Sequence, residues 1–190
     1  MLKTGLLALA LATAGGTASA DPLFDVYRSA CVKTDGDGVA AMAAATANGF
    51  SPMPKAMLDP LSQASGIDNA EGRMRSDEKG LSFIVVGSKQ FPVASGSMSM
   101  RFCAVVTTAN IASDGPLHEL AAWAATPPLS EGGDQGITAY AFLKNGDAHE
   151  TLAGVTPGAL QSAAATGRMR LAFFQARDAT NMLAYAVPTL

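Results

Sequence analysis

Apolar and polar residues alternate most clearly in the segment 97–108. Met98, Met100 and Phe102 fall on one side of an extended chain, and Cys103 falls on the other. A period of two is typical of a β-strand with one buried face, so this segment is predicted to be a strand.

Other segments are rich in β-branched and aromatic residues and are bounded by turn residues. Asn145-Gly146 gives the clearest hairpin signal, because both residues tolerate the positive φ of a type I′ turn. We therefore predict strands at 81–86, 97–108, 137–143, 148–152, 168–177 and 182–187.

Helical periodicity marks the first part of the chain. In the segment 23–32, apolar residues recur at i, i+3, i+4 and i+7, with Asp21 suited to the N-cap and Pro22 to the first helical position. Helices are predicted at 23–32, 39–47, 116–125 and 157–165, with a proline-interrupted helix at 55–64. The rest of the proline-containing stretch 51–80 is predicted to form turns and loops.

Hairpins outnumber possible β-α-β crossovers in this order of elements. We therefore predict a single α+β domain over residues 21–190. It consists of an antiparallel sheet of about five or six strands, with helices packed mainly on one face.

Residues 1–20 have the pattern of a Sec-type signal peptide. Lys3 gives a positively charged start, an apolar run of about ten residues follows, and Ala18-Ser19-Ala20 is a small-residue cleavage site. The apolar run is much shorter than the roughly 20 residues that span a bilayer. We expect this segment to be removed and the mature chain to be periplasmic or secreted, without membrane insertion.

The chain has two cysteines, Cys31 and Cys103, that are far apart in the sequence. In an oxidising compartment such a pair is expected to form one disulfide. Neither cysteine lies in a C-x-x-C arrangement, which is the pattern typical of a reactive thiol pair. We predict a structural Cys31–Cys103 bridge.

Charge narrows the range of partners. Across 190 residues, 13 Lys and Arg stand against 16 Asp and Glu, for a net charge of −3, and the basic residues do not cluster. This argues against a surface for nucleic acid or anionic membranes.

The sequence contains two His-Glu pairs, His118-Glu119 and His149-Glu150. Both lack the second histidine of the H-E-x-x-H zinc motif, because Ala122 and Ala153 stand at its position. Residues 76–79 match S-x-x-K, but the motifs that accompany it in penicillin-recognising enzymes are absent from the mature chain. A small secreted hydrolase remains an alternative, with acid–base residues assembled only by the fold. Its candidates are His118, Glu119, His149 and the acidic residues of 76–79.

Asp35-Gly36-Asp37-Gly38 resembles the start of a calcium loop, but the later ligand positions hold Val39, Ala40 and Thr46. A turn with a helix N-cap explains it better. A soft-metal (copper) carrier is a second alternative, in which Met98 and Met100 bind Cu(I), with Met53 and Met57 completing the site.

These considerations leave no residue set that predicts a catalytic, cofactor or metal site. We therefore expect a non-enzymatic exported module, stabilised by one disulfide. Its partner would be a protein or a small-molecule ligand in the cell envelope.

Overall fold

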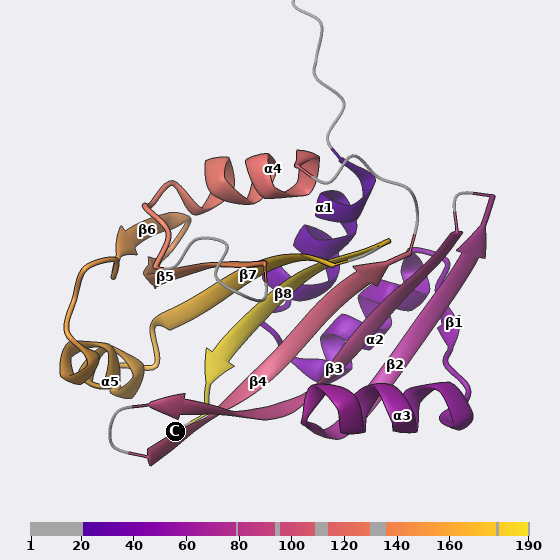
Figure 1. Ribbon diagram of the computed structural model, residues 1–190, viewed down its shortest axis with the longest axis horizontal. Helices are drawn as coiled ribbons and strands as arrows, with labels where there is room; N and C mark the ends of the chain where they lie inside the picture. The colour runs from indigo at the N-terminus through magenta and orange to yellow at the C-terminus, as the bar shows by residue number, and fades with distance from the viewer. Residues whose placement is uncertain are drawn as a thin grey trace, which may run out of the picture.

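The computed structural model describes residues 21–78, 80–93, 96–108, 114–129, 136–177 and 179–189 (Figure 1). Within them, eight antiparallel strands form one sheet in the order β1-β2-β3-β4-β8-β7-β5-β6. The strands are β1 (Ser51–Pro52), β2 (Ile67–Asp77), β3 (Gly80–Val93), β4 (Gly96–Thr107), β5 (Ile137–Asn145), β6 (Ala148–Thr151), β7 (Met169–Arg177) and β8 (Thr180–Pro188). The helical elements are α1 (Pro22–Tyr27), the π-helical segment η1 (Arg28–Val32), α2 (Gly38–Ala47), α3 (Lys55–Ser65), α4 (Gly115–Ala124) and α5 (Pro157–Ala165).

Helices cover the two faces of the sheet unequally. On the first face, α1, η1, α2 and α4 bury a core that includes Tyr27, Leu120 and Tyr185. On the second face, α3 and α5 cover opposite ends and leave the middle of the sheet without a helix (Figure 1). The predicted α+β class and the antiparallel sheet are confirmed, and most helices lie on the first face as predicted.

The predicted number of strands is too small, because β1 and β2 lie in the stretch predicted to form loops. β2 contains few large apolar residues, and only its positions at Ile67 and Gly72 are buried. Its pairing partner β3 supplies the apolar side chains of that part of the sheet. A strand whose neighbour carries the hydrophobic pattern gives a weak local signal.

The alternation predicted for 97–108 is present in β4. Met100 and Phe102 belong to the core of the second face, and Cys103 belongs to the core of the first face. Cys103 is joined to Cys31 of η1 by a disulfide with a Cα–Cα distance of 5.4 Å, a usual separation for such a bridge. The bridge ties the helices of the first face to the centre of the sheet.

β3 and β4 form a long arm that curls over the second face. β3 is closely packed against the start of β2 at Gly87, where a Cβ atom would lie 2.5 Å from Ile67 Cγ2 and 2.6 Å from the Asp68 carbonyl oxygen. Further along the arm, the Phe91 ring stacks on Phe173 of β7, with centroids 5.8 Å apart. These two rings come from strands that are not neighbours in the sheet, so the arm folds back across the face between them.

The predicted signal peptide, residues 1–20, lies outside the described residues. Among the helices that are described, none combines the length and the apolar character needed to cross a membrane.

Candidate functional site

The densest charged cluster surrounds Asp35, in the loop between η1 and α2. Arg170 of β7 donates from Nε to Asp35 Oδ1 (2.8 Å) and from Nη2 to Oδ2 (2.5 Å). Lys144 Nζ of β5 lies 3.3 Å from Oδ1, and the Tyr185 hydroxyl of β8 donates to Oδ1 at 3.2 Å. We call these four residues the Asp35 clamp.

Burial and charge shift the pKa values in the clamp. Partial burial of Asp35 acts to raise its pKa, but the hydrogen bonds and charge of Arg170, followed by those of Lys144, outweigh it and lower the pKa to about 2. Burial opposes the charge on Arg170, but the Asp35 carboxylate keeps the pKa of that guanidinium raised. Burial, followed by the charge of Asp35, raises the pKa of Tyr185. All three groups are thereby held in their usual charge states at neutral pH.

This chemistry is that of a structural anchor. Arg170 Nη1 also donates to two backbone carbonyls, and its side chain is only 9% exposed. Asp35 adopts a left-handed backbone conformation (φ 54°), which aspartate tolerates better than most residues. The neighbouring Asp37 side chain caps α2 at Ala40 N–H, as the predicted N-cap requires. The clamp fixes this loop to β5, β7 and β8.

The hydrolase candidates are not gathered into one place. His149 of β6 stacks on Phe142 with centroids 4.1 Å apart, and its Nδ1 lies 3.1 Å from the Ala124 carbonyl oxygen at the end of α4. His118 lies in the first turn of α4. It is six residues before Ala124, which corresponds to roughly 9 Å along the helix axis at 1.5 Å per residue. Glu119 accepts a hydrogen bond from the Asp21 backbone N–H.

The S-x-x-K segment lies at the other side of the sheet. Ser76 and Asp77 end β2, Glu78 follows in a turn, and Lys79 is outside the described residues. Because β2 and β6 are separated by five intervening strands, His149 is about 29 Å from this segment, at 4.8 Å per strand. These groups do not form one acid–base site.

The methionines considered for copper also separate. Met98 and Met100 share one face of β4, and Met100 is fully buried. Met53 packs over Gly72 of β2. Gly72 pairs with Val85 of β3, and Val85 pairs with Ala104 of β4, so these residues are side by side across the sheet. Ala104 is four residues from Met100, roughly 13 Å along the strand. Met53 therefore lies apart from the pair in β4.

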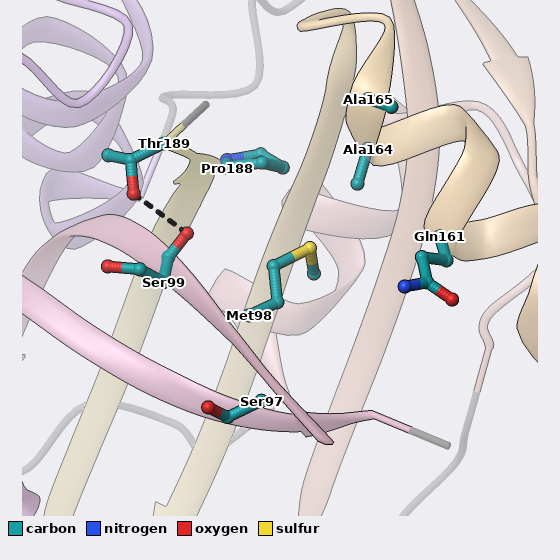
Figure 2. Close-up of a pocket in the computed structure, with 8 residues that line it drawn as sticks. All are labelled: Ser97, Met98, Ser99, Gln161, Ala164, Ala165, Pro188 and Thr189. Carbon is teal, nitrogen blue, oxygen red and sulfur yellow. Dashed lines mark hydrogen bonds between the residues drawn. The ribbon is translucent and has the colours of Figure 1, made fainter. Parts of the chain in front are cut away.

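A cleft of about 260 Å³ opens between the β3–β4 arm and α5 (Figure 2). One wall comes from the start of β4, the second from α5 and the third from the end of β8. The lining residues are Ser97, Met98, Ser99, Gln161, Ala164, Ala165, Pro188 and Thr189. Figure 2 shows the Met98 side chain at the centre of the cleft, between β4 and α5.

The lining of this cleft is uncharged and combines polar with apolar groups. Three hydroxyls and one carboxamide are combined with a thioether, a proline ring and two methyl groups. The arm that forms one wall is held in place by Phe91 on Phe173 and by Lys89, whose Nζ donates to the Ser65 carbonyl at 2.6 Å. Burial lowers the pKa of Lys89. The arrangement suits a ligand that is neutral and forms hydrogen bonds.

Sequence reasoning identified Met98 as a candidate but did not identify the cleft. The β4 wall is 62 residues before the α5 wall and the α5 wall is 23 residues before the β8 wall, and no local sequence pattern links the three. Among the described residues, no group of three or more His, Cys, Asp and Glu side chains is placed to hold a metal ion.

In comparisons with protein-family models, curated proteins and solved structures, no match to this chain was found.

Proposed function

We propose that this protein is an exported, non-enzymatic binding module whose ligand site is the cleft between the β3–β4 arm and α5. The observation that carries the proposal is the uncharged, hydrogen-bonding lining of that cleft. Binding sites of this type combine apolar surface with a few polar groups that orient the ligand.

The distribution of charge supports a binding role for the cleft rather than for the clamp. At the clamp, the Asp35 carboxylate accepts from three side chains at once. A ligand there would have to break an interaction network that holds three strands to the helical layer. At the cleft, a neutral ligand meets hydroxyl and amide groups without displacing an ion pair.

Export is the second part of the proposal. Residues 1–20 have the composition of a signal peptide, and the Cys31–Cys103 disulfide suits an oxidising compartment. The mature chain would act in the periplasm or outside the cell.

A photo-crosslinking amino acid at Ala165 tests the binding role in the producing cells. Ala165 lines the cleft and is exposed, and Val39 on α2, 83% exposed on the opposite side of the sheet, provides the matched control position. We expect a discrete covalent adduct from position 165 that is absent from position 39. Equal adducts from both positions, or none from position 165, would contradict the proposal.

A further inference from the structure

β4 extends further than the strand beside it. On its β3 side, β4 is paired as far as Gly96, opposite Val93. On its β8 side, the pairing ends at Met100, opposite Pro188. Beyond that point, Thr189 donates from its backbone N–H and its hydroxyl to the Ser99 carbonyl oxygen, both at 3.0 Å. Among the described residues, no strand pairs with 96–98 on this side.

The backbone of Ser97 faces the cleft. Alternate residues of a strand direct their N–H and C=O groups to the same side. The Ser99 carbonyl points toward β8, because it accepts from Thr189, so the N–H and C=O of Ser97 point that way too. The partner of Ser97 on β3 is Pro92, which has no N–H to donate and therefore suits a position without a ladder hydrogen bond.

The cleft therefore lies beyond Thr189, the last described residue after β8, between the edge of β4 and α5. Figure 1 shows the β3–β4 arm extending past the end of β8 toward α5. Opposite the start of β4, the other wall of the cleft is a helix, α5, and not a strand. This helix contributes the small side chains of Ala164 and Ala165. A bound chain would have main-chain partners on one side and a helix surface on the other.

We propose that the cleft binds an extended peptide segment of a partner protein, added as a short strand antiparallel to β4 along the line of β8. This proposal rests on the proposed function and names its ligand. Strand addition takes its affinity from main-chain hydrogen bonds and its selectivity from pockets for alternate side chains. The uncharged lining and the volume of about 260 Å³ select segments with small, uncharged side chains.

The segment in contact is short. Because Thr189 already occupies the Ser99 carbonyl, an added strand lies along 96–98, about 7 Å of β4, and Ser97 supplies its main-chain hydrogen bonds. Each main-chain hydrogen bond is expected to change affinity by roughly two- to tenfold.

Two variants of Ser97 separate main-chain recognition from side-chain recognition. Ser97→Pro removes the N–H that faces the cleft, and Ser97→Ala removes only the hydroxyl. The probes are octapeptides selected from a random display library against the full chain, whose binding is lost when Ala165→Trp, at an exposed lining position, fills the cleft. We expect Ser97→Pro to weaken binding roughly two- to tenfold more than Ser97→Ala does. Equal affinity for the two variants would overturn the proposal.

A second measurement does not depend on the folding of Ser97→Pro. Each selected peptide is N-methylated at odd or at even positions, because only one set can face β4. One set should lose binding at least tenfold and the other should retain it; equal effects would overturn strand addition.

The outcomes distinguish this proposal from the proposed function. If no selected peptide depends on the cleft while position 165 still forms its adduct, the cleft binds a ligand other than a peptide strand. Self-association that Ala165→Trp abolishes would identify a second copy of the chain as the occupant and would also overturn the proposal.

Discussion

Neutralising Asp35 tests the energetic role of the clamp. In Asp35→Asn, the guanidinium of Arg170 keeps its position but loses its carboxylate, while its side chain remains 91% covered by the protein. The pKa of Asp35 falls from 3.8 to about 2 in the folded chain, which corresponds to about 2.4 kcal/mol at 1.36 kcal/mol per pKa unit. Asp35 is 32% exposed, so water screens part of this interaction. We expect Asp35→Asn to lower the free energy of unfolding by about 1–2 kcal/mol at pH 7.

The pH dependence of this difference has a defined sign. Because the folded pKa lies below the unfolded value, the ionised carboxylate contributes stability above pH 3.8. That contribution is lost as the pH falls from 3.8 toward 2 and Asp35 takes up a proton in the folded state. The difference between wild type and Asp35→Asn should therefore be constant near neutral pH and shrink across this acidic range.

Urea unfolding followed by the fluorescence of Trp123, the single tryptophan, measures this effect. The ring centroids of Trp123 and Tyr185, one of the clamp residues, are 6.3 Å apart, so the Trp123 emission reports on that region. Asp147→Asn, at an exposed position in the β5–β6 turn, is the matched control and should change stability by less than about 0.5 kcal/mol. The reasoning would be refuted if Asp35→Asn lowered the free energy of unfolding no more than the control does. It would also be refuted if the difference in that free energy from wild type grew as the pH falls.

Three further changes probe the scaffold by the same unfolding measurement. Replacing both cysteines by serine opens a loop with a sequence separation of 72 residues, and we expect a loss of about 4 kcal/mol; an unchanged midpoint would show that the bridge contributes nothing. Gly87→Ala should cost about 1–3 kcal/mol, because its Cβ would overlap Ile67. Gly158→Ala, where a Cβ has open space, should cost nothing, and equal effects of the two would disprove the steric argument. His149→Ala should cost about 1–2 kcal/mol through the lost ring contacts with Phe142 and Trp123, and wild-type stability would contradict that estimate.

Local patterns were sufficient to predict the elements whose own side chains form the core. The alternation of Met98, Met100 and Phe102 specified the buried face of β4, and the Asn145-Gly146 turn marked the β5–β6 hairpin. The capped start at Asp21 is present, since its side chain accepts from Leu23 N–H. In each case the residues that carry the signal are within a few positions of one another.

Features that depend on distant residues were not predictable in this way. Asp35 was assigned only to a turn, because its partner Arg170 is 135 residues away in the sequence. The polar strand β2 was missed, since β3 supplies the apolar side chains beside it. The cleft requires β4 to extend past β8, and this offset is set by pairing register rather than by any motif.

Amide hydrogen exchange of the full chain, with and without the partner captured at Ala165, tests the cleft as the binding site most directly. We predict slower exchange at 96–99 and along α5 when the partner is bound, with no change in the loop that carries Asp35. Slower exchange at the Asp35 loop, with none at the cleft, would contradict this account and assign binding to the clamp.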